Sequence, residues 1–169
     1  MSEARTLAPL ILAKVREQVE RADHLAALVP AGAIEWAPLP DAMRVCDLLG
    51  HLLECLGGFC AALYALHPDR LAHFASLREL PVNHCCGVAE ARGRMREYLA
   101  HIEEGFALVT DDDLARRLPT VFVAEGEASL TILLGNLEHF INHKHQLFFY
   151  LKMLGIEVST SDLYQLRGM

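Results

Sequence analysis

Three histidines lie close together in the stretch EHFINHKHQLFFYLKMLG, residues 138–155: His139, His143 and His145. In an α-helix, residues four apart lie one above the other on the same face, so a helix here would stack His139 on His143. Such a pair can present two imidazole nitrogens to one metal ion. The same spacing also occurs where each histidine only hydrogen-bonds a neighbouring helix. The pair alone therefore leaves a metal site and a purely structural role equally open.

The face that carries this pair holds further polar side chains. Asn136, Gln146 and Tyr150 continue the line of His139 and His143 when residues are placed at 3.6 per turn. An apolar stripe borders that line and consists of Leu133, Leu137, Phe140, Leu147, Leu151 and Leu154. Buried polar groups cost free energy unless they are paired. We therefore expect the polar row to face the core or a cleft at its edge, with Asn136, Gln146 and Tyr150 binding substrate or water.

The opposite face of the same helix is predicted to be solvated. Its members are Glu138, Asn142, His145 and Lys152. A charged and polar face opposite an apolar stripe is typical of a helix at the surface of a globular domain. His145 is therefore interpreted as a surface histidine that takes no part in a metal site.

A third histidine lies far upstream in RVCDLLGHLLECLGGFC, residues 44–60. The apolar residues at helical spacing in this region are Val45, Leu48, Leu52, Phe59 and Leu63. His51 falls at the edge of that apolar face, with Glu54 close by on the same side. If both helices pack in one core, His51 meets His139 and His143 between them. Glu54 is then a catalytic candidate that could orient a ligand or move a proton, and a plain surface carboxylate is an equal interpretation.

Three neutral imidazoles on one divalent ion leave coordination positions open for water or substrate, as in catalytic metal sites. Bound water would become acidic enough to act as a nucleophile near neutral pH. A bound thiol would become a thiolate. The predicted cofactor is zinc, nickel or iron(II), all of which accept such ligands, and the predicted ligands are His51, His139 and His143.

Four long helical patterns must position these residues. They are expected at Leu7–Leu28, Ala42–Leu66, Val88–Thr110 and Ser129–Leu154. Thr6 and Ser129 are plausible N-caps, and Gly155 is a plausible residue just past the last helix. The fold class predicted from this pattern is all-α, a four-helix bundle in a single domain covering residues 1–169.

The connections after the first three helices are longer and irregular. We expect a short helical turn within residues 67–87, another at Asp112–Arg117 and an extended piece at Val121–Val123. Connections of this length leave the order of helix directions open, with up-down-up-down as the default for short loops.

Composition excludes several classes of function. The chain has 169 residues, of which 53% are hydrophobic and 22% charged, with a formal net charge of −7. The mean hydropathy of +0.23 indicates a dense helical core or surface buried against a second copy of the chain. No basic footprint for nucleic acid is present. No uninterrupted apolar run is long enough to span a bilayer, and the N-terminal stretch does not resemble a signal peptide, so we expect a cytoplasmic protein without membrane contact.

The five cysteines are Cys46, Cys55, Cys60, Cys85 and Cys86. An odd number without a secretion signal predicts reduced, mostly buried thiols. The adjacent pair Cys85–Cys86 gives no zinc-knuckle spacing. Cys55, four residues after His51, could approach a metal ion there, but we interpret it as a small buried hydrophobe.

Two segments together resemble a known family. DLLGHLLE, which contains His51, and HFINHKHQLFFYLKMLG are similar to the sequence pattern of the DinB-like (DNA-damage-inducible B) superfamily. That pattern ends in a histidine, three residues, then His-Arg-Gly-Gln and a tyrosine-leucine-arginine run that closes on glycine. The chain departs from it at Lys144 and His145, where arginine and glycine are usual.

The resemblance implies a bundle of up-down-down-up order, with His51, His139 and His143 holding a divalent metal. It further implies a homodimer and a thiol-dependent enzyme, since known members include S-transferases and a mycothiol-dependent maleylpyruvate isomerase. A low-molecular-weight thiol would then be the co-substrate. DNA binding is not implied. Two alternatives stay open: a metal-dependent hydrolase with Glu54 as general base, and a non-catalytic helical binding module.

Overall fold

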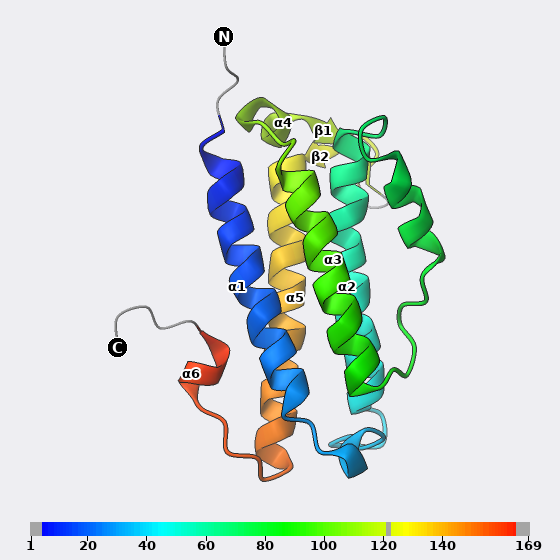
Figure 1. Ribbon diagram of the computed structural model, residues 1–169, viewed down its shortest axis with the longest axis vertical. Coiled ribbons are helices and arrows are strands. Elements are labelled where there is room, and N and C mark those ends of the chain that lie inside the picture. The colour runs from blue at the N-terminus through cyan, green and yellow to red at the C-terminus, as the bar shows by residue number, and fades with distance from the viewer. Residues whose placement is uncertain (1–4, 121–122, 165–169) are drawn as a thin grey trace.

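The computed structural model describes residues 5–120 and 123–164, and it is built mainly of helices (Figure 1). Four long helices lie side by side: α1 (Leu7–Ala27), α2 (Val45–Leu66), α3 (Val88–Phe106) and α5 (Ser129–Met153). In Figure 1, α1 and α5 run downwards while α2 and α3 run upwards. The predicted all-α class is confirmed, and the helix directions follow the up-down-down-up order rather than the up-down-up-down default.

Short elements occupy the connections between the long helices. They are η1 (Ala31–Ala33), η2 (Ala72–Glu79), α4 (Asp111–Ala115) and the strands β1 (Arg117–Leu118) and β2 (Glu127–Ala128); α6 (Thr160–Leu163) follows α5. The two strands pair antiparallel, with Arg117 opposite Ala128. The turns expected after the second and third helices are thus η2 and α4. The extended piece expected at Val121–Val123 lies largely outside the described residues.

The ends of the long helices agree with the sequence pattern within a few residues. The largest difference at a helix start is at α2, which begins at Val45 instead of Ala42 because Arg44 has an extended backbone with ψ 160°. At the end of α5, Gly155 has φ +78°, and its N–H donates to the carbonyl of Lys152 at 3.0 Å. This left-handed conformation favours glycine, so the predicted helix stop is confirmed.

The position of the first predicted N-cap is confirmed, whereas the second predicted N-cap was wrong. The side chain of Thr6 makes no capping hydrogen bond. Instead, the carboxylate of Asp111 accepts from the backbone N–H groups of Thr6 at 3.1 Å and Leu7 at 3.0 Å, so a residue of α4 caps α1. The N-cap of α5 is Ala128, and Ser129 is its first helical residue. The Ser129 hydroxyl donates to the carbonyl of Asp113 at 2.7 Å, which ties α5 to α4.

A buried capping box begins α4. The Thr110 hydroxyl accepts from the N–H of Asp113 at 3.1 Å, and Asp113 Oδ2 accepts from the Thr110 N–H at 3.0 Å and its hydroxyl at 2.8 Å. Burial by itself acts to raise the pKa of Asp113. The hydrogen bonds from Thr110, with His67 and Arg116 nearby, outweigh it and hold that pKa below its usual value.

Helix α2 is the core helix that carries His51. It packs against both α3 and α5, and its fully buried residues include Leu48, Leu52, Phe59 and Leu63. Residues Val45–Leu66 are long and apolar enough to cross a membrane, but 61% of the most apolar window is buried inside the protein. Burial of this kind is typical of a core helix in a soluble bundle. It also holds the backbone around His51 in a rigid position.

The face of α5 expected to be solvated is partly covered. Lys144 is fully buried, and its Nζ donates to Gln18 Oε1 at 2.5 Å and to the carbonyl of Leu163 at 3.0 Å. Burial lowers the pKa of Lys144 to about 8. His145 is half-buried and its ring lies 6.5 Å from that of Tyr164, so it faces solvent only in part, less than the sequence pattern predicted. The cause is α6 and the residue that follows it, which fold back over this side of the helix.

Candidate metal centre

The structure brings together His51, His139 and His143. Their ligand nitrogens all lie within 4.8 Å of one another. The Nε2 atoms of His51 and His139 are 3.2 Å apart, and the ring of His51 lies 4.3 Å from that of His143. Helix α2 supplies the first histidine and two adjacent turns of α5 supply the others. The cluster therefore exists only where these two helices pack.

The back of the His51 ring is held by two oxygens. Its Nδ1 lies 2.6 Å from Asn83 Oδ1 and 2.9 Å from Glu54 Oε2. Both oxygens are acceptors, so Nδ1 carries the proton and shares it between them. The opposite nitrogen, Nε2, then keeps its lone pair and faces the cluster. This is the arrangement that orients a metal-binding histidine from behind.

The tautomer of His143 follows from a chain of hydrogen bonds that begins at a backbone carbonyl. The Tyr150 hydroxyl donates to the carbonyl of Met43 at 3.0 Å and so must accept from Gln146 Nε2 at 2.8 Å. Gln146 Oε1 is thereby turned toward His143 Nδ1, 2.9 Å away, and accepts its proton. His143 Nε2 is left unprotonated and available to a metal ion.

Burial also favours the neutral form of His143. Desolvation lowers the pKa of His143, and the nearby His51 and His139 lower it further, against a smaller raising effect of the Gln146 hydrogen bond. A metal-binding imidazole must be unprotonated, so a lowered pKa keeps this one ready at neutral pH.

The spacing of the nitrogens fits a divalent ion. Two nitrogens that each lie 2.0–2.1 Å from a tetrahedral metal ion are separated by about 3.3 Å, and the His51 and His139 nitrogens are 3.2 Å apart. Neutral imidazoles suit zinc, nickel and iron(II). His139 is exposed while His51 and His143 are half-buried, so the cluster opens to solvent on one side. A metal ion there would keep positions free for water or a small ligand.

Two cavities, each of about 230 Å³, lie along α2, and none of the three histidines lines either of them. One is bordered by Asn136 on α5, and the other reaches Glu54; Gly58 lines both. A side chain at Gly58 would meet Asn136 Oδ1 at 3.2 Å, so the glycine lets Asn136 approach α2. The remaining linings are mainly apolar, among them Ala61, Tyr64, Leu77, Ile132 and Leu118.

The other residues singled out from the sequence fall into four groups. Gln146 and Tyr150 stand behind His143 and hold it, so their hydrogen bonds point away from a substrate role. Asn136 borders a cavity and remains placed for substrate contact. Glu54 contacts His51 and is 43% exposed, which is compatible with either orienting the ligand or moving a proton. Cys55 is buried, and burial raises its pKa to about 12, as expected of a structural thiol.

The expectation that all cysteines are reduced was wrong. Cys46, at the start of α2, forms a disulfide with Cys85 across a Cα–Cα distance of 4.4 Å. Cys55, Cys60 and Cys86 are free and buried. The spacing of 39 residues carried no signal for this pairing, because it depends on the path of the irregular segment before α3. The same segment contributes Asn83, which the sequence pattern also missed.

Comparison with known proteins supports the fold. The chain resembles the crystal structure of YjoA, a DinB-like protein from Bacillus subtilis, with a TM-score of 0.68 over 88% of this chain and 94% of that one. The two sequences are 17% identical, so the likeness speaks to the fold, which is DinB-like. No protein-family model and no curated protein matches the chain.

Proposed function

We propose that the chain binds one divalent metal ion through the Nε2 atoms of His51, His139 and His143. The observation that carries this proposal is the convergence of the three rings, with His51 and His143 each protonated on the far nitrogen. Histidines whose second ring nitrogen is already hydrogen-bonded lose little conformational freedom when they bind a metal ion. Zinc, nickel and iron(II) are the ions that this donor set suits.

We further propose that the site activates a low-molecular-weight thiol for transfer to an electrophile. A bound divalent ion supplies acidity to a thiol or water in its open positions. The thiol sulfur forms a bond to an electrophilic carbon, and its proton leaves with the displaced group. Asn136 and the apolar cavity beside it would hold the organic part of the electrophile.

A metal-dependent hydrolase is the second candidate. The observation in its favour is the exposed carboxylate of Glu54, which stands beside the cluster and could accept a proton from a bound water. Its contact with His51 Nδ1 favours an orienting role instead. The third candidate is a helical binding module without catalysis, in which the three histidines are remnants and a groove holds a ligand or a partner.

Parallel assays on metal-loaded protein separate these candidates. One arm combines a panel of thiols with alkyl halides and epoxides, and the other uses esters and amides without thiol. We expect turnover only in the first arm, lost in His143→Ala and reduced modestly in Glu54→Gln. Ester hydrolysis that disappears in Glu54→Gln would favour the hydrolase. No turnover in either arm, together with full stability and ligand binding of the His51/His139/His143 triple alanine variant, would favour the binding module.

A homodimer and a cytoplasmic location complete the proposal. Several large apolar side chains are exposed on the described surface, including Leu134, Phe149 and Met153 on α5. A second copy of the chain would cover such residues, and small molecules are the only other partners we expect. Sedimentation velocity gives the test: a species of twice the chain mass supports the dimer, and a monomer at micromolar concentration contradicts it.

A further inference from the structure

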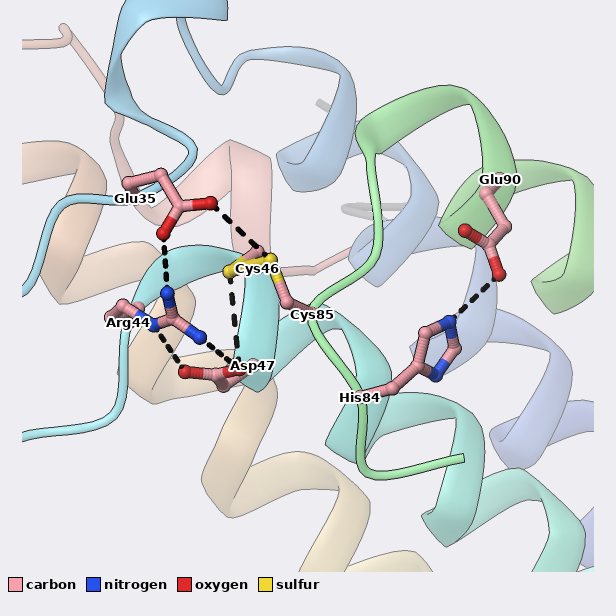
Figure 2. Close-up of a disulfide and its surroundings, with 7 residues drawn as sticks. All are labelled: Glu35, Arg44, Cys46, Asp47, His84, Cys85 and Glu90. Carbon is pink, nitrogen blue, oxygen red and sulfur yellow. Dashed lines mark hydrogen bonds and ion pairs between the residues drawn. A yellow bond between two sulfur atoms is a disulfide. The ribbon is translucent and has the colours of Figure 1, made fainter. Parts of the chain in front are cut away.

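Residues 83–86 lie along the first turns of α2 and are fastened to it at several points. The Cys46–Cys85 disulfide is the covalent link (Figure 2). The N–H of Cys86 donates to the carbonyl of Cys46, and the N–H of Asn83 to that of Gly50, both at 3.2 Å. A short segment of irregular chain is thus held in register with the helix that carries His51.

The approach between this segment and α2 is close at one point. A side chain at Gly50 would meet the carbonyl oxygen of His84 at 2.0 Å, so only glycine permits the contact. The next residue in the helix is His51, and Asn83 Oδ1 reaches its Nδ1 at 2.6 Å. Asn83 has φ +53°, a conformation in which asparagine is tolerated and most residues are strained. The position of its side chain therefore depends on the segment staying docked.

We propose that the Cys46–Cys85 disulfide is a redox-sensitive clamp: it holds Asn83 against His51, and its reduction by a small thiol weakens metal binding at the three histidines. The inference rests on the metal site proposed above and adds a positioning residue and a means of regulation. Without the covalent link, two backbone hydrogen bonds, the His84–Glu90 contact and the buried side chain of Cys86 remain to hold the segment. Asn83 then leaves His51 for part of the time.

The disulfide is placed for reaction with a small thiol. Cys85 is exposed, whereas Cys46 is fully buried, so an incoming thiolate attacks the sulfur of Cys85. The first step joins that thiol to Cys85 and releases Cys46, which takes a proton. A second thiol attacks the mixed disulfide and releases Cys85 as a thiol with a small-molecule disulfide. Two thiols are oxidised and one protein disulfide is reduced.

The surroundings favour the protonated product. Glu35 Oε1 lies 3.5 Å from the sulfur of Cys85, and Asp47 Oδ1 lies 3.9 Å from that of Cys46 (Figure 2). Arg44 contacts both carboxylates and offsets part of their charge. The sulfur atoms of a disulfide carry no hydrogen and cannot donate to these carboxylates. After reduction, the two new S–H groups can donate to them. Reduction is thus chemically accommodated at this place.

A thiol count tests the starting state. Protein purified without reductant, denatured and titrated with a thiol reagent should show three thiols, those of Cys55, Cys60 and Cys86. Small thiols at millimolar concentration, added to the native protein, should raise the count to five. Five thiols before any treatment, or resistance of the native protein to the added thiol, overturns the clamp.

A double-mutant cycle on zinc affinity tests the consequence. The disulfide-free form is Cys46→Ala/Cys85→Ala, because the reduced thiols with Glu35 could themselves hold a metal ion and confuse the reading. Asn83→Gly removes the side chain without straining the backbone at positive φ. Competition against a chromophoric chelator gives the zinc dissociation constant of each variant, at a temperature where circular dichroism shows all of them folded.

We expect Asn83→Gly to weaken zinc binding about tenfold in the disulfide-bonded protein, as the loss of a hydrogen bond behind a ligand does. The cysteine variant should lose a similar factor, and adding Asn83→Gly to it should cost less than about threefold. Asn142→Gly, on the exposed face of α5, is the matched control and should leave the zinc dissociation constant unchanged. Equal zinc affinity with and without the disulfide, or full additivity of the Asn83→Gly and cysteine effects, overturns the clamp but does not contradict the metal site. No zinc binding by any form contradicts the metal site and the clamp together.

Discussion

The Nε2 atoms of His51 and His139 lie 3.2 Å apart although 88 residues separate the two side chains in the sequence. At that distance each nitrogen either shares a proton with the other or shares a metal ion. The proton of His51 is already engaged on Nδ1 by Asn83 and Glu54. A proton between the two rings would then have to come from His139, whereas a divalent cation there would use the lone pairs of both nitrogens, and the predictions below follow from the cation.

Tyr150→Phe should weaken metal binding although Tyr150 lies a full turn beyond Gln146. The variant removes the hydroxyl that fixes the orientation of the Gln146 amide, so the proton on His143 is no longer held on Nδ1. We expect about a tenfold loss of zinc affinity in a chelator competition. Tyr64→Phe, the same change about three and a half turns along α2 from His51, is the control. An unchanged zinc affinity in Tyr150→Phe would show that the hydrogen bonds from Tyr150 through Gln146 do not set the tautomer of His143.

Gly50→Ala and Gly57→Ala should shift stability in opposite directions. A Cβ at Gly50 would collide with the carbonyl of His84 at 2.0 Å, while one at Gly57 would only touch the Tyr98 hydroxyl at 3.8 Å. We expect Gly50→Ala to lower the free energy of unfolding by about 1–3 kcal/mol through overpacking. Gly57→Ala should raise it by about 0.5–1 kcal/mol, the usual gain of alanine over glycine within a helix. Urea unfolding measures both, and stabilisation by both variants would contradict the close approach.

Asp113 should contribute to acid stability. Its pKa is held below the usual value in the folded protein, so the unfolded chain binds the proton more readily. The contribution is fully present above the unfolded pKa and is lost as the pH falls through the folded one. The free energy of unfolding should thus fall between about pH 5 and pH 2 in the wild type and less steeply in Asp113→Asn.

The control for the Asp113 variant is the same change at its exposed neighbour, Asp112. Asp113→Asn should also cost about 1–2 kcal/mol at pH 7, since it weakens a buried capping box. Asp112→Asn, on the exposed side of the same turn, should leave both stability and its pH dependence close to the wild type. Parallel pH profiles for all three proteins would contradict this role of Asp113.

The sequence predicted those parts of the site that depend on local geometry. The pairing of His139 with His143 needs only the helical repeat, and the place of His51 follows from its position at the edge of an apolar face. Asn83 and the Cys46–Cys85 disulfide were missed because residues 67–87 have no periodicity from which a path could be drawn.

Packing by a distant segment explains the error on the outer face of α5. A helical wheel places Lys144 and His145 by their angle alone. In the folded chain α6 returns to α1 and covers this side, where His24 Nε2 lies 2.8 Å from Asp162 Oδ1. A long lysine side chain can then be buried with two acceptors. Such a contact between chain ends leaves no repeat in the sequence.

Metal content of His143→Ala and His145→Ala tests the central claim most directly. Both changes remove one imidazole from α5, but only His143 belongs to the cluster. After incubation with zinc or nickel and gel filtration, elemental analysis should find one metal ion per chain in the wild type and in His145→Ala. His143→Ala should bind the metal ion more than about 100-fold more weakly, which exceeds the usual effect of removing a residue that only hydrogen-bonds a ligand. A wild-type chain without metal, or equal retention by both variants, would contradict the account.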